Sequence, residues 1–115
     1  MENLNFIIKS KKFTTEPLKV GNLIDLWKMR SVLSMGNYGN IYRMGFINAD
    51  DALMIIDIEA FFTVFCPDFI QSLKPGSIRD LGVEDYIEIR DVYTKDILPW
   101  LEKVENILKK KSDNA

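Results

Sequence analysis

The amino-acid sequence predicts a mainly α-helical fold, and two patterns support this. Residues 49–68 are apolar almost all the way round a helix, so the rest of the chain has to enclose them. Residues 83–110 repeat apolar residues at the period of an amphipathic helix. A chain of 115 residues has the usual size of one domain. We predict a single domain, with an extended or hairpin arm at 1–19, a helical core at 20–110 and a polar tail at 111–115.

The N-terminal residues predict a short β-hairpin. Leu4–Ser10 contains the β-branched and aromatic residues typical of a strand, and Phe13–Thr15 can start a second strand. Lys11 and Lys12 are the predicted turn. Pro17 has no backbone N–H to donate, so it restricts the second strand to the edge of a sheet.

A first helix is predicted over Val20–Ser34, where apolar residues recur at helical spacing. We place Trp27 in the core together with the leucines of this helix. Gly36 and Gly39 end it, since glycine is permissive where the chain must turn. A further single helical turn is predicted over Ile41–Gly45.

The central apolar helix is predicted to begin near Asn48, a favourable N-cap residue. It ends at Cys66, because the residue before a proline disfavours the helical conformation. A short helix over Pro67–Lys74 follows, with proline at its first position. Pro75-Gly76 is predicted to form a turn, and Ser77–Leu81 a single helical turn.

The last helix is predicted over Val83–Lys110. Pro99 lies inside this pattern, where it removes one backbone hydrogen bond and clashes with the carbonyl of Lys95. We therefore predict a long helix kinked near Asp96–Pro99, or two abutting helices. Its apolar face consists of Tyr86, Ile89, Tyr93, Ile97, Trp100, Leu101, Val104 and Leu108.

The composition argues against several classes of partner. The net charge of -2 predicts no electrostatic attraction to nucleic acid or to anionic lipid. Asp57 and Glu59 interrupt the longest apolar stretch, so we expect no membrane span. One cysteine cannot form an internal disulfide and suggests a reducing compartment, so we expect a cytoplasmic protein.

The residue types also argue against catalysis. The chain has no histidine, which is the best proton carrier near neutral pH and the commonest metal ligand. Gly36-Asn-Tyr-Gly39 lacks the lysine and hydroxyl residue of a phosphate loop. Cys66 is either a nucleophile at a helix end or a small buried apolar residue, and the helix dipole favours the second interpretation. We expect no enzyme activity, no metal and no cofactor.

Asp57 and Glu59 are the most unusual pair. They lie two residues apart on a helix, so they point in different directions and form no catalytic dyad. One interpretation is that they are solvated strips or form ion pairs with Arg43, Arg79 or a lysine. The other is that they make polar contacts with a partner or a second copy. The first is favoured, because a buried carboxylate normally needs a partner.

A binding surface is predicted on the loop Asn37–Tyr42. Tyrosines beside flexible glycines suit such a surface, although both rings could instead cover the helix pair. The outer faces of the first and last helices are further candidates. The predicted partner-binding residues are Asn37, Tyr38, Tyr42, Asp57 and Glu59.

Three segments between Phe13 and Leu108 form a series. Pro17–Arg30 has a proline, then apolar residues and glycine at the entry to a helix. Ala60–Asp68 ends a central helix at cysteine-proline-aspartate. Leu81–Tyr93 opens the last helix with leucine and then acidic residues. Together they resemble the phage tail assembly chaperone family of long-tailed phages and prophages. Two positions, Lys19 and Asn22, depart from the family's threonine and aspartate.

The resemblance implies a small helical protein that works in the host cytoplasm without a cofactor. It would bind the apolar tape-measure protein, keep it soluble, help to recruit tail-tube subunits and leave before the particle is complete. A holding protein needs an apolar groove and self-association, so a homo-oligomer is expected.

Two other functions are compatible with the sequence. One is a small structural or adaptor protein that stays in the phage particle. The other is a DNA-binding regulator built on the helices around Gly36 and Gly39. Lys28, Arg30 and Arg43 are few cations for such a regulator.

Overall fold

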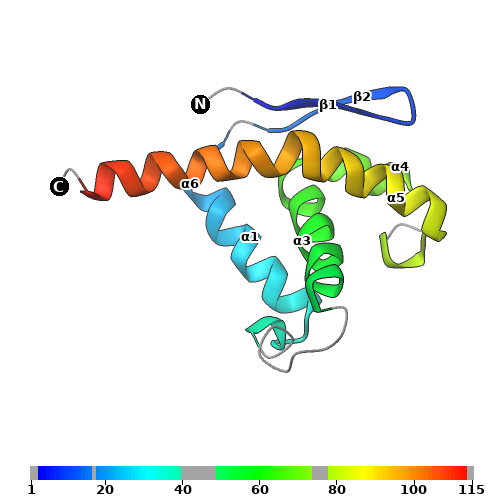
Figure 1. Ribbon diagram of the computed structural model, residues 1–115, viewed down its shortest axis with the longest axis horizontal. Helices are drawn as coiled ribbons and strands as arrows, with labels where there is room; N and C mark the ends of the chain where they lie inside the picture. Colours follow the sequence, from blue (N-terminus) through cyan, green and yellow to red (C-terminus); the bar gives the residue numbers. More distant parts are fainter. Residues whose placement is uncertain (1–2, 17, 40–48, 74–77, 114–115) are drawn as a thin grey trace.

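The computed structural model describes residues 3–16, 18–39, 49–73 and 78–113. Within these ranges, the backbone alone is described for residues 49–51 and 108–113. The structure is mostly helical, with a two-stranded antiparallel hairpin near the N-terminus and a long helical segment at the C-terminal end (Figure 1). The elements are β1 (Asn5–Ile8), β2 (Lys11–Thr14), α1 (Val20–Leu33), α3 (Ala49–Phe65), α4 (Pro67–Ser72), η1 (Ile78–Asp80), α5 (Val83–Val92), η2 (Tyr93–Ile97) and α6 (Leu98–Asp113).

The hairpin is confirmed, but its predicted turn is wrong. Ile8 pairs with Lys11, so the turn consists of Lys9 and Ser10, whose φ angles are 51° and 64°. Two-residue turns with positive φ match the twist of the strands, and glycine or asparagine usually signals them. Because neither is present here, the sequence did not reveal the turn. This register also places Phe6 opposite Phe13 on the buried face.

Helix α1 ends as predicted before Gly36, but the left-handed position is taken by Met35. Met35 has a φ of 55°, and its N–H donates to the carbonyl of Val32. The N–H of Gly36 donates to the carbonyl of Ser31, which completes a Schellman motif. The following Tyr38 and Gly39 are already helical, so the predicted loop is wrong at these residues.

Helix α3 is enclosed, as its composition predicted. Residues 58–62 are all buried, and five consecutive residues sweep more than one full turn of a helix. Phe62 meets Phe6 of the hairpin with ring centroids 5.6 Å apart, and Phe61 meets Tyr93 of η2 at 6.2 Å. Helix α1 packs along α3 as well, beside it in Figure 1. Three separate parts of the chain therefore cover this helix, including the predicted arm at 1–19.

The break after α3 is confirmed. Cys66 leaves the helical region with a φ of -149°, and Pro67 occupies the first position of α4. Helix α4 ends at Ser72, two residues before the predicted end. The predicted turn over Ser77–Leu81 corresponds to the 3-10 helix η1. Further predictions fall outside the described residues: those for Pro17, Asn48, Ile41–Gly45 and Pro75-Gly76.

The C-terminal segment is helical from Val83 to Asp113, so the helix runs three residues past its predicted end at Lys110. A π-helical turn, η2, stands just before Pro99, where the kink was predicted. The wider turn changes the hydrogen-bond pattern where proline cannot continue it. Tyr93 and Ile97 of this turn are both buried, as the amphipathic pattern predicted.

Candidate partner-binding site

Helix α1 exposes three large apolar side chains on one side. Val20, Ile24 and Trp27 follow the spacing of a single helix stripe, and their exposed fractions are 76%, 44% and 61%. Leu26 is 4% exposed and belongs to the buried core. We call Val20, Ile24 and Trp27 the outer face of α1. An exposed apolar stripe on a helix whose other side packs on the core is a candidate surface for a partner.

The prediction that Trp27 lies in the core is therefore wrong. Leu26 and Trp27 are adjacent, so they point about 100° apart on a helix. Leu26 takes the core position, together with the half-buried Leu23, Met29 and Leu33, which pack against the core. Trp100, the other tryptophan, is buried as predicted.

A polar cluster joins the C-terminal end of α1 to the middle of α3. The Tyr38 hydroxyl donates a hydrogen bond to Oδ1 of Asp57 at 2.8 Å. Nε of Arg30 lies 2.9 Å from the same oxygen in an ion pair. The guanidinium group of Arg30 also lies over the Tyr38 ring, 5.7 Å from its centroid. These contacts hold the segment after α1 against α3.

Burial governs the protonation of this cluster. Burial, and after it the hydrogen bond to Asp57, raise the pKa of Tyr38 to about 12. Burial also raises the pKa of Asp57, although the Arg30 charge and the Tyr38 hydrogen bond lower it. The pKa of Tyr93 is raised, first by burial and then by the charge of Asp57. Tyr38 and Tyr93 are therefore neutral at pH 7. The ion pair of the cluster is the one between Arg30 and Asp57.

The predicted binding residues are placed in four different ways. Tyr38 and Asp57 are brought together, by contacts within the chain. Asn37 is exposed, and its N–H donates to the carbonyl of Ser34. Glu59 is only 7% exposed, so the prediction of a solvated strip is wrong for this residue. Tyr42 lies outside the described residues.

The cation that pairs with Asp57 is not one of those predicted. Arg43 lies outside the described residues, and Arg30 makes the ion pair instead. It does so because the last turns of α1 pack on α3 and bring the two helices' charges together. Since Arg30 is engaged with Asp57, it is poorly placed to bind a phosphate, which weakens the DNA-binding alternative.

Several residues of interest were missed at the sequence level. The outer face of the first helix was a candidate surface, but its stripe of Val20, Ile24 and Trp27 was not separated from the core stripe of the same helix. Tyr93 was assigned to an apolar face, although its hydroxyl lies in the electrostatic field of Asp57. No local pattern links Tyr93 to Asp57, because 36 positions separate them in the chain.

The remaining side chains offer little chemistry. Cys66 is buried, and burial raises the pKa of its thiol, as expected of a structural cysteine. Within the described ranges, no group of three or more acidic or cysteine side chains could hold a metal ion. Among the same residues, no helix is long and apolar enough to cross a membrane.

Comparison of the chain with protein-family models, with curated proteins and with solved structures gave no match.

Proposed function

We propose that this protein is a phage tail assembly chaperone, which holds the apolar tape-measure protein through the outer face of α1 and helps to recruit tail-tube subunits. The single observation that carries the binding role is the exposure of Val20, Ile24 and Trp27 on a helix whose other side is already packed. The phage assignment rests on the sequence resemblance described above.

The spacing of the outer face supports a helical client. Side chains at positions i, i+4 and i+7 form one continuous stripe, which is how amphipathic helices engage an apolar surface. Tryptophan is among the residues that contribute most to binding when a partner covers them. A holding protein needs such a surface and needs no reactive group.

Co-expression with the tape-measure protein of the same phage or prophage tests the proposal. The wild-type protein should increase the soluble fraction of the tape-measure protein and co-purify with it. Trp27→Ser should weaken this complex at least about tenfold, because it removes the largest anchor. Lys28→Ser is the matched control, since Lys28 is the exposed neighbour of Trp27 and lies outside the outer face.

Two results would contradict the proposal. In the first, the tape-measure protein stays equally insoluble with and without this protein. In the second, Trp27→Ser and Lys28→Ser bind it equally well. Mass spectrometry of purified virions addresses the adaptor alternative, because a chaperone leaves before completion and an adaptor stays at near-stoichiometric amounts.

A further inference from the structure

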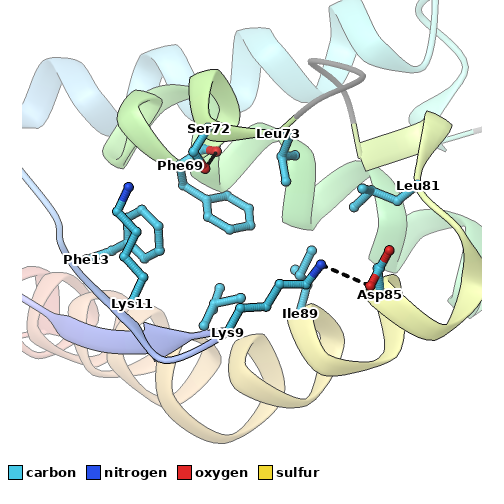
Figure 2. A pocket seen from close by; sticks show the side chains of 10 residues that line it. Lys9, Lys11, Phe13, Phe69, Ser72, Leu73, Leu81, Asp85 and Ile89 are labelled. Atoms are coloured by element: carbon cyan, nitrogen blue, oxygen red, sulfur yellow. Dashed lines mark hydrogen bonds and ion pairs between the residues drawn. The ribbon is translucent and has the colours of Figure 1, made fainter.

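A pocket lies between the hairpin, α4 and α5, and it shares no residue with the outer face of α1 (Figure 2). Its volume is about 380 Å³. The buried side chains that line it are apolar: Ile8, Phe13, Phe69 and Ile89. The half-buried Leu73 and Leu81 complete the apolar wall.

Aromatic contacts hold the lining of this pocket in place. The rings of Phe13 and Phe69 meet edge to face, with centroids 5.2 Å apart. Phe13 also stacks on Phe6 at 5.8 Å, and Phe69 packs against Phe62 at 4.3 Å. The core therefore holds the Phe13 and Phe69 part of the lining in place.

The rim of the pocket is charged differently on its two sides. On the α5 side, Nζ of Lys9 forms an ion pair with Oδ1 of Asp85 at 2.9 Å, and the N–H of Lys9 donates to Glu88 at 2.8 Å. On the β2 side, Nζ of Lys11 lies 5.4 Å from the centroid of the Phe13 ring. The Lys11 ammonium forms no ion pair with any described residue. The β2 side is therefore positive, and the α5 side is neutral to negative.

Among the described residues that line the pocket, Ser72 is the one uncharged polar side chain. The hydroxyl of Ser72 lines it but already donates to the carbonyl of Phe69 at 2.6 Å. Sites for small molecules usually present several convergent polar groups that fix the orientation of the ligand. An apolar lining with charge only at the rim instead suits the anchor side chain of a polypeptide.

We propose that this pocket receives a large apolar side chain of a partner polypeptide, with a neighbouring carboxylate of that partner bound to Lys11. A volume of about 380 Å³ is at the small end for ligand sites, which fits one aromatic or leucine side chain and its backbone. The rim sets the orientation, because Lys11 on the β2 side is a cation unpaired by any described residue, whereas Lys9 on the α5 side is already paired with Asp85. This second site is independent of the client-binding role proposed for α1.

Nuclear magnetic resonance of the ¹⁵N-labelled full-length chain tests this proposal with capped peptides. The probes are Ac-Ala-Glu-Phe-Ala-NH₂, its Glu-to-Lys analogue and its Phe-to-Ser analogue. The first should shift the backbone amides of Phe13, Phe69, Leu73 and Ile89. The lysine peptide should bind about two- to fivefold more weakly, as expected for one exposed ion pair. The serine peptide should not shift these amides.

Two variants assign the charge preference to Lys11. Lys11→Glu should reverse the order of the acidic and basic peptides. Lys12→Glu is the matched control, because adjacent residues of a strand point to opposite faces and Lys12 does not line the pocket. Circular dichroism spectra of both variants should match the wild type, since both side chains are exposed.

Four outcomes would overturn the proposal. One is a shift pattern located away from the pocket. Another is equal binding of the acidic and basic peptides to the wild type. A third is an equal effect of Lys11→Glu and Lys12→Glu. The last is binding of free 3-phenylpropionate as tightly as the acidic peptide, which would indicate a small-molecule site.

Discussion

Arg30, Tyr38 and Asp57 show how one half-buried carboxylate is accommodated between two helices. Burial alone disfavours the charged form of Asp57, and this effect exceeds the compensation from its two partners, since the pKa is raised. The Asp57 carboxylate still contributes to the fold, because it is the acceptor for the Tyr38 hydroxyl and the ion-pair partner of Arg30. Removing the acceptor should therefore be more damaging than neutralising it.

Substitutions at Asp57 separate these two effects. Asp57→Ala leaves the Tyr38 hydroxyl and the Arg30 guanidinium group without their acceptor, so it should lower the free energy of unfolding by about 1–3 kcal/mol. Asp57→Asn keeps an acceptor oxygen and removes the half-buried negative charge, so it should stay within about 1 kcal/mol of the wild type. Urea denaturation followed by circular dichroism measures both. Equal losses for the two variants would show that the charge itself stabilises the fold.

Tyr38 should make the protein sensitive to alkali. Its pKa is about 12 in the folded chain and near 10 when unfolded, so the folded state keeps the proton longer. Its stabilising contribution is complete below pH 10 and is lost as the pH rises through about 12. Tyr93 acts in the same direction. Tyr38→Phe should lower stability by about 1 kcal/mol at pH 7 and flatten the decline above pH 10. An unchanged alkaline slope would contradict the assignment.

At the scale of the element, α1 is apolar on two sides, and the fold uses only one of them. Leu26 faces the core, and Trp27, its neighbour, faces outward. The two residues have similar hydrophobic character, so local propensity cannot choose between them. Packing against α3 makes the choice.

The neighbouring pair gives a direct test of the orientation of α1. Leu26→Ala should lower the free energy of unfolding by about 2–5 kcal/mol, because it leaves a cavity in the core. Trp27→Ala should change it by no more than about 0.5 kcal/mol, as for most surface substitutions. Thermal unfolding followed by circular dichroism compares the two. A large loss for Trp27→Ala would mean that this side of α1 is covered within the protein.

At the scale of the whole molecule, the hairpin is part of the core. Phe6 contacts Phe62 of α3, and Phe13 contacts Phe69 of α4, so the strands cover two helices. Lys9 also contacts Asp85 and Glu88 of α5. An arm that packs on three helices should unfold together with them.

Cooperative unfolding can be measured at Trp100, far from the hairpin in sequence. In a Trp27→Phe background, Trp100 is the remaining tryptophan, and its fluorescence should report the same transition as circular dichroism. Phe6→Ala should lower the free energy of unfolding by about 3–5 kcal/mol, and by the same amount with both probes. Ile7→Ala, on the exposed face of the same strand, is the control and should have little effect. An unchanged Trp100 transition in Phe6→Ala would show that the hairpin unfolds separately.

The sequence by itself determined the features that depend on local chemistry. The enclosure of α3 follows from its apolar composition on every side. The break at Cys66 follows from the geometry of Pro67, and the buried face of the last helix from its period. An irregularity near Pro99 was also expected, because proline cannot continue the hydrogen-bond pattern, but it was predicted as a kink or two abutting helices and the structure has a π-helical turn.

Only the tertiary structure decided the features that depend on residues distant in sequence. It selected Arg30 as the partner of Asp57, turned Trp27 outward and set the hairpin register that places the turn at Lys9 and Ser10. It also formed the pocket between the hairpin, α4 and α5. Each of these results depends on how helices and strands pack, and packing energies are summed over contacts that no local pattern encodes.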